Sequence, residues 1–181
     1  MKTNNFVHLL KEREKFGKQH HMFNIPEETG RFLYVIMQVK KPSVILEVGT
    51  SNGYSTLWFA YASPKAKIYT IEQDPQKIVL AKGNFKTMKN IHLFEGPANK
   101  ILKKIKIKPD VVFLDATKNE YKSYLKVIEP HLKKDSLIIA DNTISHAKKM
   151  RDYLIYVNKK YTSTTLKIGT GVTLSICSRQ I

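Results

Sequence analysis

The segment of residues 44–55, with the sequence VILEVGTSNGYS, constrains the fold more than any other part of the chain. It begins with a continuous apolar run from Val44 to Leu46, which is typical of a strand buried on both faces. A loop containing Gly49 and Gly53 follows, and residues 54–60 then have the apolar spacing of a helix. Such a junction presents free backbone N–H groups and the positive end of a helix dipole to a ligand. The segment therefore predicts a ligand site between a strand and a helix.

Strands and helices alternate regularly after this segment. Further strands are expected at residues 66–72, 91–95, 109–115 and 137–141, and helices at 75–85, 98–106, 118–132 and 145–159. Residues 161–167 and 172–177 alternate like a closing antiparallel pair. This order predicts an α/β fold in which crossover helices connect the strands of a parallel sheet.

Two helices are expected before the first strand. Residues 4–16 place Phe6, Leu9 and Leu10 on one face, and a second helix starts at Pro26 and runs to Lys40. The break between them is expected at residues 17–24, where His20 and His21 would be loop residues. Five apolar residues carry the pattern of the second helix: Phe32, Leu33, Val35, Ile36 and Val39. We expect one domain over residues 1–181, with residues 1–25 as a helical extension.

The composition is ordinary for a globular protein except for its charge. The 181 residues include 31 Lys and Arg against 15 Asp and Glu, a net charge of +16. Such a charge attracts polyanions such as RNA, although a lysine-rich surface can also simply be solvated. The single cysteine, Cys177, excludes an internal disulfide and fits a reducing compartment. Because no apolar run approaches the roughly 18 residues of a membrane span, we expect a soluble, cytoplasmic protein without a membrane partner.

Polar residues stand at the end of each expected parallel strand. These are Glu47, Glu72, Asp115, and Asp141 followed by Asn142. Ligands of open α/β sheets bind outside the carboxyl ends of the strands, and a carboxylate about 20 residues after the glycine loop commonly binds ribose hydroxyls. Glu72 has this position. If strands four and five are neighbours, the oxygens of Asp115, Asp141 and Asn142 converge, and such a set suits Mg²⁺.

A lysine stands beside this expected metal site. Lys118 follows Asp115 by three residues, so it can point at the same place from the start of the next helix. Partial desolvation near a divalent cation disfavours the ammonium form of a lysine. Lys118 is therefore a candidate general base for removing a hydroxyl proton.

Two motifs resemble known families. The spacing Glu-x-Gly-x-x-x-Gly of residues 47–53 resembles motif I of the class I S-adenosylmethionine (SAM) methyltransferases, and DVVFLDATKNEY followed by LIIADN resembles the metal-dependent O-methyltransferases that act on catechol and caffeoyl-coenzyme A. The resemblance implies a Rossmann-like α/β fold, with a mostly parallel seven-stranded sheet, an antiparallel last strand and helices on both faces. It implies SAM and Mg²⁺, or another divalent cation, as cofactors.

The resemblance also implies residue roles. Lys118 would be the catalytic base, and Asp115, Asp141 and Asn142 the metal ligands. The residues implied in SAM binding follow motif I and the ends of the next strands: Glu47, Gly49, Thr50, Ser51, Gly53, Ser55, Glu72, Gln73, Gly96, Pro97, Ala98 and Asp115.

The acceptor implied by the resemblance is a small hydroxylated molecule such as a catechol. Residues 141–146 are expected to lead directly into a helix, which His146 would cap unless it contacts the acceptor, and the N-terminal region is short. We therefore expect an open acceptor pocket. Because of the positive net charge, two alternatives remain. The first is a methyltransferase acting on a hydroxylated nucleoside in tRNA, and the second is a non-catalytic nucleic-acid-binding protein on the same scaffold. The apolar face of the first helix could serve a homodimer.

Overall fold

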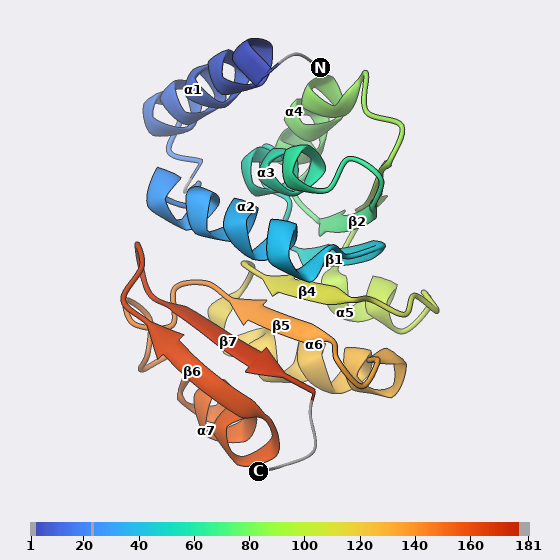
Figure 1. Cartoon of the computed structure of the whole chain (residues 1–181), viewed down its shortest axis with the longest axis vertical. Helices are drawn as coiled ribbons and strands as arrows, with labels where there is room; N and C mark the ends of the chain where they lie inside the picture. The colour runs from blue at the N-terminus through green and yellow to red at the C-terminus, as the bar shows by residue number, and fades with distance from the viewer. Residues whose placement is uncertain (1–2, 23, 178–181) are drawn as a thin grey trace.

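A computed structural model describes residues 3–22 and 24–177 of the chain. Its centre is a seven-stranded sheet in the order β3-β2-β1-β4-β5-β7-β6 (Figure 1). The strands are β1 (Val44–Val48), β2 (Lys67–Glu72), β3 (Ile91–Glu95), β4 (Val111–Leu114), β5 (Leu137–Ala140), β6 (Thr162–Leu166) and β7 (Val172–Ile176). Only β7 is antiparallel to its neighbours β5 and β6. The expected fold class is therefore confirmed, including the neighbouring positions of β4 and β5.

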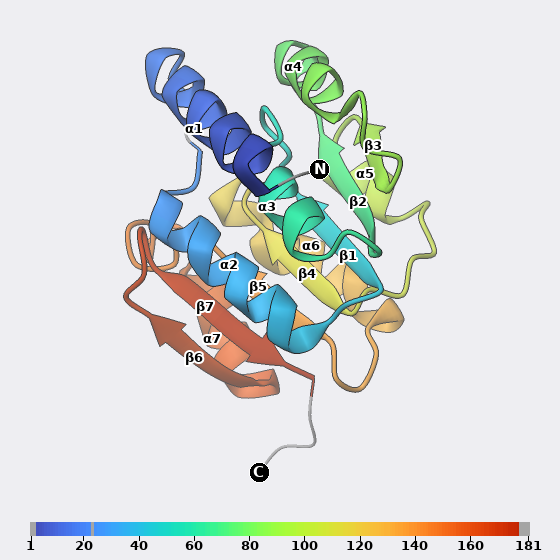
Figure 2. The same ribbon diagram turned by 45° about the horizontal axis from the view of Figure 1, so that its top comes forward.

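Helices cover both faces of the sheet, as Figure 2 shows. They are α1 (Thr3–Gln19), α2 (Glu27–Lys40), α3 (Tyr54–Ala62), α4 (Pro75–Phe85), α5 (Ala98–Leu102), α6 (Tyr121–Ile128) and α7 (Arg151–Lys160), with 3₁₀ turns η1 (Lys118–Glu120) and η2 (Glu129–His131). Buried residues of α1 to α4 form one apolar cluster with one face of the sheet, and those of α5 to α7 form another with the opposite face. None of the helices in the described ranges is long and apolar enough to span a membrane.

The central strands are apolar because both of their faces are buried. In β4, Val111 and Phe113 belong to the first cluster, whereas Val112 and Leu114 belong to the second. All four side chains are fully buried. A strand covered on both faces needs apolar residues at successive positions, which explains the continuous runs in the sequence.

The N-terminal helix is longer than expected. α1 continues through Gly17 to Gln19, so the break predicted at residue 17 is wrong. A side chain at Gly17 would collide with Asn24, which folds back against the helix. Phe6 is buried and stacks on Tyr61 of α3, with 3.8 Å between ring centroids. The apolar face that we considered for a homodimer is therefore used within the chain.

The second helix buries only part of the apolar set that the pattern predicts. Leu33 is buried, and Phe32 and Ile36 pack against the core. Val35 and Val39, however, are 56% and 76% exposed, and Gly30 and Met37 are buried in their place. The cause is the close crossing of α2 and α3, because a Cβ atom at Gly30 would lie 2.3 Å from the ring of Trp58. The glycine thus selects the contact face, and the two valines remain outside.

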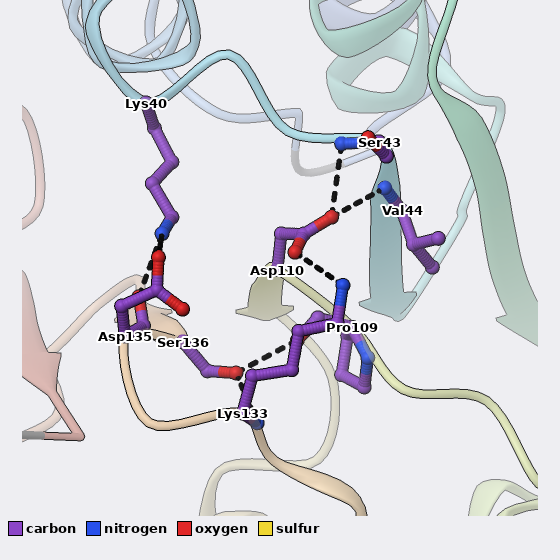
Figure 3. Close-up of polar contacts among 8 residues, drawn as sticks. All are labelled: Lys40, Ser43, Val44, Pro109, Asp110, Lys133, Asp135 and Ser136. Atoms are coloured by element: carbon purple, nitrogen blue, oxygen red, sulfur yellow. Dashed lines mark hydrogen bonds and ion pairs between the residues drawn. The ribbon is translucent and has the colours of Figure 1, made fainter.

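A polar cluster closes the amino-terminal edge of the sheet (Figure 3). One oxygen of Asp110 accepts hydrogen bonds from the backbone N–H groups of Ser43 and Val44, at 2.9 Å each, and Lys133 binds the other oxygen. Burial raises the pKa of Asp110, but these hydrogen bonds outweigh it and the pKa is lowered. The cluster links the starts of β1 and β4 to the loop before β5. The opposite, carboxyl-terminal edge is left for a ligand.

The segment after β5 differs from the expectation. The helix predicted from Ser145 begins only at Arg151, and residues 141–150 form turns. The backbone N–H of Thr143 donates to the carbonyl of Gly171, and that of Ser145 donates to the carbonyl of Thr170, at 3.0 Å each. Because the turn between β6 and β7 takes these amides, the segment follows that turn and does not become helical.

Candidate active site

A pocket of about 530 Å³ opens at the carboxyl ends of the parallel strands. Its walls come from the loops after β1 to β5, which is where an open α/β sheet places its ligand. Ten of the residues implied by the resemblance line it: Gly49, Ser51, Glu72, Gln73, Gly96, Ala98, Asp115, Lys118, Asp141 and Asn142. The structure thus brings these ten residues to one cavity.

Glu72 is the last residue of β2, and its side chain holds the loop after β1 in place. Its Oε2 accepts a hydrogen bond from the backbone N–H of Ser51 at 2.7 Å, and its Oε1 accepts from those of Gln73 and Asp74. The carboxylate is therefore held in a fixed orientation at the pocket wall. A fixed acceptor at this place can bind hydroxyl groups of a ligand.

The two glycines of the first loop have different roles. Gly49 has a φ of 101°, and a Cβ atom there would lie 2.1 Å from the carbonyl oxygen of Asp115. Only glycine allows this close approach of the loops after β1 and β4, which narrows the floor of the pocket. Gly53 has a φ of 87° and packs against Phe85 at the start of α3. It belongs to the support of the loop, since it is not among the residues that line the pocket.

Glu47 lies beneath the loop and is fully buried. Its carboxylate accepts hydrogen bonds from the hydroxyls of Ser55 and Thr56, at 2.5 Å each, and of Thr70 at 2.6 Å. Burial outweighs these hydrogen bonds and raises the pKa of Glu47 to about 7. Thr50, which is also buried, bonds to the same Thr70.

Not every predicted cofactor residue reaches the cavity. The pocket walls in the described ranges do not include Glu47, Thr50, Gly53, Ser55 or Pro97. The hydroxyls of Ser55 and Thr50 point into the buried network around Glu47 and Thr70. Ser55 and Thr50 therefore support the glycine loop from its buried side. Thr56 and Thr70 complete the network, and neither was among the predicted site residues, because a threonine in a helix or strand carries no functional signal of its own.

Lys118 and Asp115 form an ion pair in the wall of the pocket. The Nζ atom of Lys118 lies 2.7 Å from Oδ1 of Asp115 and donates to the hydroxyl of Tyr121 at 3.1 Å. The side chains of both members of the pair are largely buried. η1 begins at Lys118, shortly after β4, and so turns the lysine back toward the strand end.

Asp141 and Asn142 follow β5 and share one partner, Thr170. The hydroxyl of Thr170 donates to Oδ1 of Asp141 at 3.1 Å and accepts from Nδ2 of Asn142 at 2.9 Å. Asn142 has a φ of 62°, which turns its side chain toward the pocket wall. Burial, followed by the negative charge of Asp115, raises the pKa of Asp141 to about 7. Thr170 was not predicted, since it comes from the distant turn between β6 and β7.

The oxygens of this wall fit a hard cation. Two carboxylates, Asp115 and Asp141, lie close enough to repel each other, and the amide oxygen of Asn142 makes no hydrogen bond in the described part of the chain. Within those residues, no group of three or more His, Cys, Asp and Glu side chains gathers around a possible metal position. The predicted set needs only two carboxylates, and its third member is an amide, a combination that Mg²⁺ accepts together with water.

The segment between α1 and α2 contributes a wall that was not expected. Met22, Asn24 and Pro26 line the pocket, and the carbonyl of Met22 accepts a hydrogen bond from the hydroxyl of Ser51 at 3.1 Å. The segment thus covers the pocket beside the loop after β1. The open acceptor side that the short N-terminal region predicts stays a prediction.

The histidines divide into two kinds. His20 lies in the turn after α1 with its ring 4.2 Å from that of Phe16, and His21 follows it, so neither lines the pocket. His146 does line it, and its Nδ1 lies 2.9 Å from the hydroxyl of Ser145. Because no helix begins at this position, the prediction that His146 caps a helix is wrong.

Comparisons with known proteins agree with this geometry. The sequence model described as O-methyltransferase matches residues 3–174. A catechol O-methyltransferase of Niastella koreensis is 32% identical over 133 residues, which make up 69% of this chain and 60% of that protein. The matched regions span 45% to 60% of the length of the first three curated relatives.

Solved structures share the fold over nearly the whole chain. A crystal structure from Staphylococcus aureus, provisionally named a caffeoyl-CoA O-methyltransferase, has a TM-score of 0.86 at 25% identity and covers 92% of this chain and 91% of that one. The SAH-bound methyltransferase PaMTH1 of Podospora anserina has a TM-score of 0.84 at 22% identity, and the match covers 94% of this chain and 86% of that one. The match of the family model to nearly all of the sequence decides the assignment: the chain belongs to the O-methyltransferase family.

Proposed function

We propose that this protein transfers the methyl group of SAM to a hydroxyl group of a small hydroxylated acceptor, with the assistance of a divalent cation. One observation carries the proposal: Asp115, Lys118, Asp141 and Asn142 line the same pocket as the glycine loop and Glu72. The catechol O-methyltransferase from Niastella koreensis and the SAH-bound structure from Podospora anserina support this acceptor class and this cofactor.

The cofactor would lie along the loops after β1, β2 and β3. Glu72 would accept hydrogen bonds from the ribose hydroxyls, and Gly49 would let the methionine end approach the backbone. Gly96 and Ala98, at the far side of the pocket, would contact the adenine. A cofactor in this orientation has its methyl group near Asp115, which follows β4.

Asp115, Asp141 and Asn142 would hold the cation, which would supply a lower pKa for the acceptor hydroxyl when bound. In its neutral form, Lys118 would take the hydroxyl proton on Nζ and become an ammonium ion paired with Asp115, with Tyr121 fixing the position of the nitrogen atom. Thr170 would keep Asp141 and Asn142 in position. Most of the rate gain would come from holding the acceptor oxygen in line with the methyl group and from the charges placed around it.

The test uses SAM labelled in its methyl group, incubated with the protein, Mg²⁺ and a fractionated cell extract. We expect label in the small-molecule fraction and its loss when EDTA removes divalent cations. SAM binding is measured separately by calorimetry. Transfer that EDTA never affects would refute the role of the cation, and absence of SAM binding would refute the proposed activity.

RNA is the alternative acceptor, and the net charge of +16 favours it. In that case the incorporated label would be released by ribonuclease. The same experiment therefore separates the two acceptor classes. A protein that bound RNA in a salt-sensitive way but did not bind SAM would instead be the non-catalytic form of this scaffold.

A further inference from the structure

A turn from near the end of the chain completes the pocket wall that contains Asp141 and Asn142. This turn joins β6 to β7 and carries Thr170, which lines the pocket together with those two residues. Thr170 lies 28 positions after Asn142 in the sequence. Its hydroxyl group nevertheless makes hydrogen bonds with the side chains of both residues. Two of the three proposed cation ligands therefore share one partner that their own motif does not contain.

A single hydroxyl proton sets the direction of both hydrogen bonds of Thr170. In the ionised form that binds a cation, the carboxylate of Asp141 can only accept, so the proton of Thr170 points to it, over 3.1 Å. The hydroxyl oxygen then has only lone pairs left for Asn142, which lies 2.9 Å away, and an amide can meet lone pairs only with its NH₂ group. The amide oxygen of Asn142 is thereby turned away from Thr170, and it is the atom that a hard cation requires.

The turn itself is held on both sides of Thr170. On one side, the backbone N–H of Gly169 donates to Oε2 of Glu28 at 3.1 Å, and a Cβ atom at Gly169 would lie 2.4 Å from the hydroxyl oxygen of Thr29 in α2. On the other side, a Cβ atom at Gly171 would lie 2.5 Å from Ile144. The turn is thus packed between the start of α2 and the segment after β5 (Figure 2). Thr170 therefore has a defined position before a cation binds.

The backbone at Asn142 also depends on this turn. Asn142 has a φ of 62°, a left-handed conformation that costs energy in most residues and persists where the surroundings enforce it. Its carbonyl accepts a hydrogen bond from the backbone N–H of His146 at 2.9 Å, and the next residue, Thr143, donates its N–H to the carbonyl of Gly171 at 3.0 Å. The turn therefore restrains Asn142 through the backbone as well as through the hydroxyl of Thr170.

We propose that Thr170 is a positioning residue of the cation site: its hydroxyl directs the amide oxygen of Asn142, and holds the carboxylate of Asp141, toward a divalent cation. This inference rests on the proposed function, in which Asp115, Asp141 and Asn142 hold that cation. Hydrogen-bond partners behind metal ligands fix the orientation of the ligands, and their loss typically weakens metal binding by about 10–100-fold.

The test compares two substitutions at Thr170. Thr170→Val keeps the shape of the side chain but removes both hydrogen bonds, whereas Thr170→Ser keeps the hydroxyl group. Mn²⁺ binding is followed by electron paramagnetic resonance with SAM present and no acceptor, so that no turnover is needed. The valine variant should bind Mn²⁺ about tenfold more weakly than the wild type or worse, and the serine variant should bind it nearly as well as the wild type. An equal loss in both variants would show that packing, and not the hydroxyl, matters.

A control variant and SAM affinity distinguish positioning from a general disturbance of the fold. Thr164→Val makes the same change at an exposed residue of β6 and should keep the wild-type affinity for Mn²⁺. SAM affinity, measured by calorimetry, should be unchanged in all of these variants, because the proposed SAM contacts lie on the loops after β1, β2 and β3. A valine variant that lost affinity for SAM together with Mn²⁺ would contradict a role confined to the cation site.

The wild-type protein separates this inference from the proposed function. If it does not bind SAM, the proposed activity fails. If it binds SAM but no Mn²⁺, the proposed role of the cation fails, and the role of Thr170 fails with it. If it binds both, and Thr170→Val binds Mn²⁺ with wild-type affinity, only the role of Thr170 is refuted.

Discussion

Lys118, which we propose as the base, has its side chain held from two sides. Its ammonium group is held between the carboxylate of Asp115 and the hydroxyl of Tyr121, which leaves it little freedom inside a partly buried pocket. For a lysine on the surface, such an ion pair would add little to the stability of the fold. A base must have this restraint, because proton transfer depends on hydrogen-bond distance to the acceptor hydroxyl.

The substitution Lys118→Ala should lower the rate of methyl transfer by about 10²-fold or more while leaving SAM affinity unchanged. The reason is that the base is lost but the loops after β1 and β2 are not touched. Rates are measured with labelled SAM, and affinity by calorimetry. Lys126→Ala, an exposed lysine on α6, is the control and should keep wild-type activity. Wild-type transfer by the Lys118 variant would show that another group removes the proton.

The substitution Asp141→Ala should abolish the stimulation of activity by Mg²⁺. It removes one of the two carboxylates that face the proposed cation position, and an amide and one carboxylate bind Mg²⁺ weakly. Activity is measured over a series of Mg²⁺ concentrations, and Mn²⁺ binding is followed by electron paramagnetic resonance. A variant with the wild-type Mg²⁺ response and the wild-type Mn²⁺ affinity would exclude Asp141 as a ligand.

Glu47 makes stability depend on pH in a defined direction. Its pKa is about 7 in the folded protein and about 4.3 in an unfolded chain. Between these values the folded state keeps a proton that the unfolded state has released, so ionisation of Glu47 favours unfolding. Its contribution to the free energy of unfolding is therefore present below about pH 4 and is lost as the pH rises through 7.

The substitution Glu47→Gln should remove this pH dependence. The free energy of unfolding of the variant minus that of the wild type should increase by on the order of 1–3 kcal/mol from pH 5 to pH 8. The reason is that the wild type loses stability as Glu47 ionises, whereas glutamine releases no proton. Urea unfolding at the two pH values measures the change, and the comparison cancels the titration of all other groups. An unchanged difference between the two proteins would mean that Glu47 is ionised throughout this range.

At the scale of elements, the crossing of α2 and α3 sets the position of the first helical layer. Gly30 allows the Trp58 ring to lie directly against the α2 backbone. Trp58 belongs to α3, which begins directly after the glycine loop. This contact therefore also helps to hold the loop that lines the proposed cofactor site. A change in helix spacing here would reach the pocket through α3.

The substitution Gly30→Ala should lower the free energy of unfolding by about 1–3 kcal/mol, because the new methyl group would overlap the Trp58 ring. Gly83→Ala is the matched control. A Cβ atom at Gly83 in α4 would meet no atom within 4 Å, so alanine should raise stability by about 0.5–1 kcal/mol through helix propensity. Chemical denaturation of both variants tests the pair. Equal effects of the two substitutions would contradict a close α2–α3 crossing.

At the scale of the whole molecule, the net charge of +16 opposes the compact state. Only some of the lysines are paired with acids in the described residues, so most of the positive charge repels itself across the surface. Salt screens such repulsion, and the Debye length falls to about 8 Å at 0.15 M. The stability of this protein should therefore depend on ionic strength.

The melting temperature should rise by a few degrees when NaCl is increased from about 10 mM to about 150 mM. The Lys103→Glu, Lys104→Glu variant carries a smaller net charge and should show a smaller rise. Calorimetric scans of both proteins at the two salt concentrations provide the measurement. A melting temperature that falls with salt would indicate that attractive ion pairs outweigh the repulsion.

The sequence by itself determined the strands, most of the helices and the chemistry at the strand ends. Continuous apolar runs such as Val111 to Leu114, set between turn residues, indicate strands buried on both faces, and the polar residues that end them must then meet at one edge. These signals are local. A window of a few residues contains the periodicity, the glycines and the pair formed by Asp115 and Lys118, so no knowledge of distant contacts is needed to find them.

Only the tertiary structure decided which distant residues complete the site and which local patterns are overridden. Thr170 joins Asp141 and Asn142 from the β6–β7 turn, and Met22 closes the pocket from before α2. Residues 145–150 have a helical pattern but form turns, because the carbonyls of Gly171 and Thr170 take the amides of Thr143 and Ser145 where the segment begins. The physical reason is that hydrogen bonds and packing contacts between distant segments outweigh local propensity, and the sequence does not show which segments will meet.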